Sequence, residues 1–248
     1  MHKEQYLSSQ AVNEFIYWVE TILDTPKSFV HAYYHEKNKK EYEFENLFSA
    51  YEKYDWVWKY TIEELSYFLM KSITESDESA CKNACYMIFE WGGVTNKGNK
   101  KRITNLSPNA CAYLLAVQKR LAMDLPSHEY FSSEIQINMT SGFSKIYSAC
   151  VKDFMIYDSR VGAALGLLVR TFCIQNNLPN IPCELQFAWI NGRGKQIRNP
   201  NYGGYEFPKL RIDKEGEYLE NNIKANWLMS AVVNTTNSKF SNLEPHVR

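Results

Sequence analysis

Lys145 and Asp158 stand at the starts of two expected helices in the stretch MTSGFSKIYSACVKDFMIYDSRVGAALGLLV, which runs from Met139 to Val169. A neutral lysine amine is a nucleophile that can attack an electrophilic carbon and form a Schiff base. An ionised carboxylate can stabilise positive charge that develops in a transition state. Together, these two residue types could cleave a bond at a carbon atom that becomes positively charged.

The sequence around each residue predicts how it is held. Thr-Ser-Gly is typical of a tight turn that leads into a helix, which places Lys145 in the first helical turn. FMIY is typical of extended chain, which makes Asp158 the N-cap of the following helix. Backbone N–H groups at a helix start favour an ionised aspartate, and they favour loss of the proton from a lysine that also lies close to Arg160.

This arrangement resembles the helix-hairpin-helix DNA glycosylase superfamily, in particular the 8-oxoguanine DNA glycosylases and the bacterial proteins of that fold. In that family a glycine-containing hairpin leads to a catalytic lysine, and an aspartate caps the next helix. SGFSK and FMIYDSRV occupy these places, and RNPNYGGYEFPKL and NNIKANWL are also similar to the bacterial branch. The resemblance implies a DNA glycosylase, with AP lyase activity, in which Lys145 attacks C1′ and Asp158 stabilises the charge on the sugar.

The chain departs from the family pattern at two points. The family hairpin reads Leu-Pro-Gly-Val-Gly-x-Lys, whereas MTSGFSK lacks the proline and has one glycine, displaced by one position. The tight run of four cysteines found in the endonuclease III branch is absent. We therefore expect no iron–sulfur cluster, no metal and no other cofactor.

The partner implied by the resemblance is double-stranded DNA with one base extruded from the stack. The expected DNA contacts near the hairpin are Ser141, Gly142, Ser144 and Arg160. Cationic residues supply further candidates for phosphate contacts: Lys97, Lys100, Lys101 and Arg102 in an expected loop, and Arg193, Lys195 and Arg198 in a Gly- and Asn-rich segment. Trp227 is a candidate for the base pocket, with a place in the core as the alternative.

Composition limits the class of protein. The chain has 28 basic and 28 acidic residues, so its net charge gives no general attraction for nucleic acid, and any DNA contact must come from a local patch. The six cysteines form no CxxC pair, which favours reduced, mostly buried thiols. No signal sequence or membrane-length apolar run is visible. We expect a cytoplasmic protein without a membrane partner.

The apolar periodicity predicts an all-α or mostly α protein. The family resemblance implies a glycosylase-like helical fold. Helices are expected over residues 11–23, 61–73, 79–90 and 216–233, and from a Ser107 cap with Pro108 in the first turn. Residues 35–54 are expected to form an exposed loop and a short amphipathic piece, and residues 190–211 an irregular arm. We expect a single domain with two helical lobes, about 1–105 and 106–248, and the site in the cleft between them.

Other interpretations of the sequence are weaker. His31 and His35 lack a third metal ligand, and NGRGK does not have the spacing of a phosphate-binding loop, because Trp189 stands where its first glycine should be. The alternative function is that of a catalytically retired protein of the same fold. Such a protein would bind nucleic acid, a nucleotide or a partner protein, for example in antiviral defence.

Overall fold

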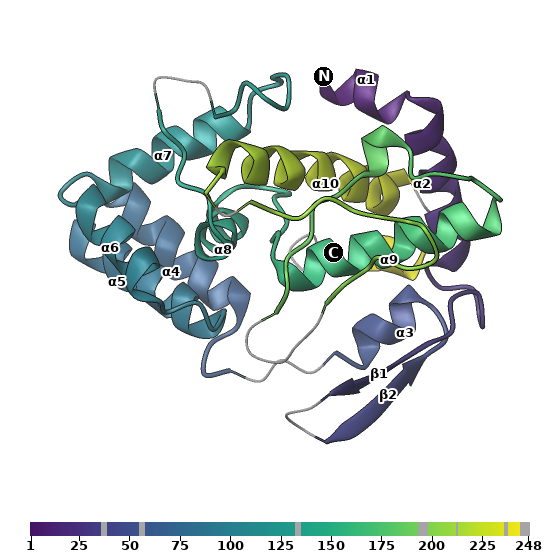
Figure 1. Cartoon of the computed structure of the whole chain (residues 1–248). Coiled ribbons are helices and arrows are strands. Elements are labelled where there is room, and N and C mark those ends of the chain that lie inside the picture. Colours follow the sequence, from purple (N-terminus) through teal and green to yellow (C-terminus); the bar gives the residue numbers. More distant parts are fainter. Residues whose placement is uncertain are drawn as a thin grey trace.

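The computed structural model describes residues 1–35, 39–54, 58–131, 135–192, 198–211, 213–235 and 238–243. Over these residues the protein is mostly helical, with one two-stranded antiparallel sheet (Figure 1), which confirms the mostly α class. The elements are α1 (Lys3–Leu7), α2 (Gln10–Ile22), β1 (His31–His35), β2 (Lys40–Phe44), α3 (Leu47–Glu52), α4 (Ile62–Thr74), α5 (Glu78–Trp91), α6 (Lys97–Leu106), α7 (Ala110–Leu121), α8 (Ser141–Cys150), α9 (Ser159–Gln175), η1 (Cys183–Leu185), α10 (Glu215–Thr235) and η2 (Lys239–Asn242).

The helices pack in two groups (Figure 1). Helices α4 to α8 form one group, and α1, α2, α9 and α10 form the other. This division differs from the lobes expected at 1–105 and 106–248, because α1 and α2 pack against α9 and α10. Tyr6 of α1 is fully buried, with its ring centroid 5.9 Å from that of Trp227 on α10. Lys145 lies on α8 and Asp158 at the start of α9, so the site lies where the groups meet.

The expectation of a loop over residues 97–102 was wrong, because helix α6 begins at Lys97. Asn96 caps this helix by accepting a hydrogen bond from the Asn99 N–H group at 2.8 Å. Asn99 and Ile103, one turn apart, form its buried face, and the lysines lie on the exposed side. A buried stripe with a single apolar residue is too weak a periodic signal to distinguish a helix from a basic loop.

The expected start of the next helix was also wrong. Helix α7 begins at Ala110, and Ser107 is instead the C-cap residue of α6. The carboxylate of Glu78, on α5, accepts hydrogen bonds from the N–H groups of Ala110 at 2.8 Å and Cys111 at 3.0 Å. The free N–H groups at the start of α7 are thus satisfied by a side chain distant in the sequence. The local Ser-Pro pattern could not indicate this partner.

The two strands were not expected from the sequence. Strand β1 pairs with β2 so that Tyr33 lies opposite Tyr42 and His31 lies opposite Phe44. Because residues 35–54 carry many charges, the alternation of apolar and polar side chains that marks a strand could not be recognised there. Helix α3 is the short amphipathic piece that was expected there.

Several local signals were confirmed. Thr61 and Glu64 form the expected capping box, in which each side chain accepts a hydrogen bond from the other residue's N–H group. Helix α10 covers the segment expected to be helical near residues 216–233. All six cysteines are unpaired, and five of them are buried. Among the described residues, no helix combines the length and apolar character that crossing a membrane requires.

Candidate active site

Lys145 and Asp158 form a buried ion pair. The Lys145 Nζ atom lies 3.0 Å from Oδ2 of Asp158 and also donates a hydrogen bond to the Ser141 carbonyl oxygen at 3.1 Å. Lys145 is 3% exposed and Asp158 is 9% exposed. The two residues that the sequence singled out are therefore in direct contact.

Helix α8 places Lys145 one turn deeper than expected. Thr140 is the N-cap residue and accepts hydrogen bonds from the N–H groups of Gly142 and Phe143, both at 3.2 Å. The helix therefore begins at Ser141, and Lys145 opens its second turn rather than lying in the first. Side chains on a helix lean toward its N-terminus, which directs the ammonium group back toward Ser141.

Asp158 is held as the N-cap residue of α9, as expected. Its Oδ1 atom accepts hydrogen bonds from the N–H groups of Arg160 at 2.8 Å and Val161 at 3.3 Å. Burial of the Asp158 carboxyl raises its pKa, but the Lys145 ammonium and the hydrogen bonds from Lys145 and Arg160 outweigh burial and hold the pKa below its usual value. Asp158 is therefore ionised at neutral pH.

Gly92, at the end of α5, makes room for the lysine. A Cβ atom on Gly92 would lie 2.3 Å from Cδ and 2.7 Å from Cε of Lys145. Neither distance is compatible with the present lysine conformation. The position of Lys145 therefore depends on a residue outside the stretch from Met139 to Val169.

Substituting Gly92 tests this dependence. Gly92→Ala is expected to push the Lys145 side chain off Asp158 and to slow its reaction with a sugar aldehyde by about tenfold or more, since small misplacements of reacting groups are costly. The rate of borohydride trapping on abasic-site DNA measures this effect.

Gly93→Ala is the matched control. Gly93 has φ of 63°, and nothing lies within 4 Å of a Cβ atom placed there. This variant should lose roughly 1 kcal/mol of stability and keep the parent's trapping rate. Equal trapping by Gly92→Ala and the parent would contradict the role of Gly92.

A cavity of about 490 Å³ borders the ion pair. This volume lies within the range of small-molecule sites, roughly 300 to 1,000 Å³. The start of each of three helices contributes to its wall: Asn96 and Gly98 for α6, Thr140 and Ser141 for α8, and Asp158, Ser159 and Arg160 for α9. Helix N-termini present N–H groups and partial positive charge, which favours an anionic ligand.

Three arginines strengthen this preference. Arg102, Arg160 and Arg198 all line the cavity. Arg102 is paired with Glu215 at 2.7 Å, Arg160 lies 3.7 Å from Asp158, and the Arg198 guanidinium donates a hydrogen bond to Ser159 Oγ at 2.6 Å. Burial and the neighbouring Arg160 lower the pKa of Arg198. The arginines outnumber the carboxylates in the cavity wall, so the cavity suits phosphate.

Two of the expected DNA contacts near Lys145 are corrected by the structure. Ser144 is fully buried, where it donates to Asn222 at 3.1 Å and accepts from the Tyr157 N–H group at 2.6 Å. Gly142 is buried inside α8, and a Cβ atom there would lie 2.3 Å from Asn99 Nδ2. Neither residue lies on a surface that DNA can reach, whereas Ser141 lines the cavity.

Of the remaining predicted contact residues, some are buried, some are exposed and some lie outside the described residues. Trp227 is 7% exposed and packs on Tyr6, so its place is in the core rather than in a base pocket. Lys97, Lys100 and Lys101 are exposed on α6, near the cavity end of that helix. Arg193 and Lys195 lie outside the described residues.

The sequence did not identify the residues that hold the site together. Asn99 donates to the Val94 carbonyl oxygen at 2.9 Å and accepts from Thr140 Oγ1 at 2.9 Å, which ties α6 to the start of α8. On the other side, Asn222 donates to the Met155 carbonyl oxygen at 3.0 Å. Tyr218 lines the cavity and donates to the Tyr157 carbonyl oxygen at 2.7 Å. The one sequence signal for this supporting role is the spacing of Tyr218 and Asn222, which places both side chains on one face of a helix.

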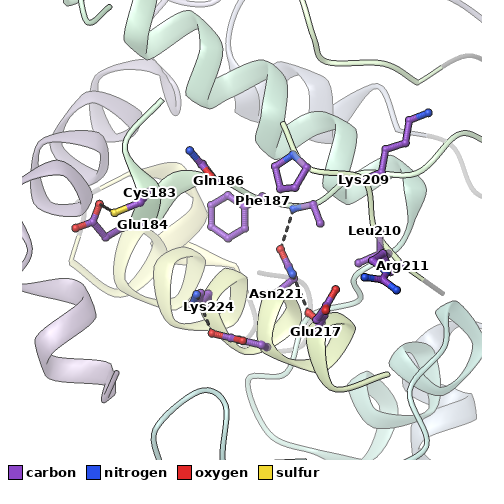
Figure 2. A pocket seen from close by; sticks show the side chains of 13 residues that line it. Cys183, Glu184, Gln186, Phe187, Lys209, Leu210, Arg211, Glu217, Asn221 and Lys224 are labelled. Atoms are coloured by element: carbon purple, nitrogen blue, oxygen red, sulfur yellow. Dashed lines mark hydrogen bonds and ion pairs between the residues drawn. The ribbon is translucent and has the colours of Figure 1, made fainter. Parts of the chain in front are cut away.

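A second hollow, of about 150 Å³, lies beside α10 (Figure 2). Its polar groups are largely used internally: Asn221 accepts from the Ala188 N–H group at 2.8 Å, and Lys224 pairs with Glu220 at 2.9 Å. It is too small for a nucleotide. Within the part of the chain that the structure describes, no three His, Cys, Asp or Glu side chains are placed to hold a metal ion.

Comparison with models of known families, with curated proteins and with solved structures finds no significant match for this chain.

Proposed function

We propose that the protein is a DNA glycosylase with AP lyase activity, in which Lys145 is the nucleophile and Asp158 the electrostatic partner. The observation that carries this proposal is the contact of 3.0 Å between Lys145 and Asp158 beside a cavity of about 490 Å³ with three arginines in its wall. An amine, a carboxylate and cations for phosphate are the groups that cleavage of an N-glycosidic bond requires.

The reaction uses each group at a defined atom. The Lys145 ammonium first releases one proton to water. The neutral Nζ then attacks C1′ of the nucleotide, the bond from C1′ to the base breaks with its electron pair going to the base, and the base takes up a proton from the lysine nitrogen. Ionised Asp158 stabilises the positive charge that develops on the sugar. The bond between C1′ and the ring oxygen then breaks as the ring oxygen takes up a proton from water, which leaves a protonated Schiff base with Lys145. Loss of a C2′ proton to water and departure of the 3′ phosphate with its electron pair then cut the strand.

The low exposure of Lys145 imposes a condition on this mechanism. Its ammonium group lies behind Ser141 and Asp158, which line the cavity. The lysine must therefore leave its hydrogen bond to the Ser141 carbonyl oxygen and turn toward the cavity when a nucleotide binds.

The second candidate function is that of a catalytically retired protein that binds nucleic acid, a nucleotide or a partner protein. The 3% exposure of Lys145 favours it, because a buried ion pair is also a common purely structural device. The two candidates differ in one assay. Borohydride reduction in the presence of an abasic-site oligonucleotide leaves a covalent adduct only if a lysine forms a Schiff base with the sugar.

The exposed lysines of α6 provide a separate test of DNA binding. Replacing Lys97, Lys100 and Lys101 with glutamine is expected to weaken binding to DNA of any sequence and to flatten its salt dependence, by roughly one unit of logarithmic slope for each phosphate interaction removed. Titrations at several salt concentrations measure the slope. Lys119→Gln, an exposed position on α7, is the control. An unchanged slope in the triple variant would show that these lysines are ordinary surface residues.

A further inference from the structure

The register of the β hairpin places its aromatic and basic side chains mainly on one face and its two glutamates on the other. Side chains alternate between the two faces of a strand, and residues opposite each other share a face. One face carries His31, Tyr33, Lys40, Tyr42 and Phe44, and no described residue on it is acidic. The opposite face carries Tyr34, Glu41 and Glu43. We call His31, Tyr33, Tyr42 and Phe44 the aromatic strip.

The rings of the aromatic strip are in contact with one another. Tyr33 and Tyr42 are stacked with centroids 5.3 Å apart and an interplanar angle of 13°. His31 lies 5.5 Å from Phe44, which lies 6.4 Å from Tyr33. Tyr33 is 41% exposed. The Lys40 ammonium lies 5.3 Å from the centre of the Tyr42 ring. The outer part of the strip is therefore a pair of stacked tyrosine rings with a cation at its end.

Electrostatic contacts connect the aromatic strip to the candidate site. Burial raises the pKa of Tyr54, Arg160 lowers it, and Asp158 and Tyr33 raise it further. Tyr54 thus lies within electrostatic range of both the strip and the ion pair's carboxylate. Burial and Arg170 lower the pKa of His31, so the strip also lies close to α9. The hairpin and α3 lie on the α9 side of the molecule (Figure 1).

We propose that the aromatic strip stacks on unpaired bases next to the nucleotide in the cavity, and that the substrate is single-stranded nucleic acid rather than the duplex that the family resemblance implies. This inference rests on the proposed function. Exposed aromatic faces beside cations are the means by which proteins hold single strands, since each base offers a flat face and each phosphate a charge. Bases inside a duplex are already stacked on each other, and their faces cannot reach Tyr33 or Tyr42.

The distribution of charge favours nucleic acid over a protein as the occupant. Lys40 stands at the end of the strip, and α9 contributes Arg160 and Arg170 nearby. The carboxylates of Glu41 and Glu43 lie on the opposite face, away from the strip. A strand that follows the strip would therefore meet cations along its phosphates on the way to the cavity.

The test compares labelled oligonucleotides of one sequence as a single strand and as a duplex, with binding measured by fluorescence anisotropy on the full chain. The single strand is expected to bind more tightly. Tyr33→Ala and Tyr42→Ala should each weaken binding of the single strand about tenfold, the scale of losing one stacked base. Tyr33→Phe, which keeps the ring, should bind like the parent.

Tyr34→Ala is the matched control, because Tyr34 lies on the same strand, is 60% exposed and points to the opposite face. It should bind the single strand like the parent. Tighter binding of the duplex, equal weakening by Tyr34→Ala and Tyr33→Ala, or no binding to either oligonucleotide would overturn the proposal, and the last result would point to a protein partner.

The outcome is separable from that of the proposed function. If the protein binds single strands through the strip but forms no borohydride adduct, the glycosylase proposal is contradicted and the single-strand proposal is supported. If the protein forms the adduct on duplex and single strand alike, and Tyr33→Ala has no effect, the glycosylase proposal is supported and the single-strand proposal is contradicted.

Discussion

Lys145→Gln is expected to abolish both borohydride trapping and strand scission on abasic-site DNA. Only a primary amine can form the Schiff base that borohydride reduces, and glutamine has none. The fold should survive, because the Asp158 carboxylate still accepts hydrogen bonds from the N–H groups of Arg160 and Val161 and remains close to the Arg160 guanidinium. Gel analysis of the covalent adduct measures the first effect, and circular dichroism with thermal melting measures the second.

Lys152→Gln is the control for Lys145→Gln, since Lys152 is exposed just beyond the end of α8. It should trap DNA like the parent. If Lys145→Gln still forms the adduct, another amine is the nucleophile. If the parent forms none on a broad panel of substrates, the ion pair is structural and the binding-protein alternative takes the place of the glycosylase proposal.

Asp158→Asn is expected to slow base excision by about 10² or more, the scale associated with loss of one preorganised electrostatic group. From the sequence alone this change should cost little stability, because asparagine is nearly as good an N-cap as aspartate. The structure alters that expectation. The substitution would leave the 3%-exposed Lys145 ammonium without its carboxylate partner, at a cost of about 2 kcal/mol or more.

The dependence of stability on pH separates these two contributions of Asp158. Its pKa is lower in the folded protein than its ordinary value, so its stabilising effect is complete above the ordinary carboxyl range and is lost as the pH falls through the folded-state pKa. Asp158→Asn should therefore flatten the acidic part of a plot of melting temperature against pH. Asp153→Asn, at an exposed position nearby, should leave both that plot and the excision rate unchanged.

Signals contained within one turn of the chain were predictable. The Thr61 capping box and the Asp158 N-cap depend on residues two or three positions apart, and both are present in the structure. Such interactions form without help from distant segments, so their residue types are sufficient evidence.

The features that the sequence did not reveal depend on contacts between distant segments. The start of α7 is completed by Glu78 from α5, and the burial of Lys145 depends on Gly92. Ser144 has the polar side chain expected of a DNA contact, yet Asn222 on α10 uses that hydroxyl inside the protein. A single sequence gives the chemistry of these side chains and does not give their partners.

The contacts of α10 have a consequence for the order in which the chain is made. Ser144, Tyr157 and Arg102 are held by Asn222, Tyr218 and Glu215, all of which belong to α10. During synthesis, Lys145 and Asp158 leave the ribosome well before these partners do. Because domains fold as their segments become available, a nascent chain carries the lysine without Tyr218, the residue of α10 that completes the cavity wall, until α10 emerges. Assembly of the complete cavity is thus a late event in the synthesis of each molecule.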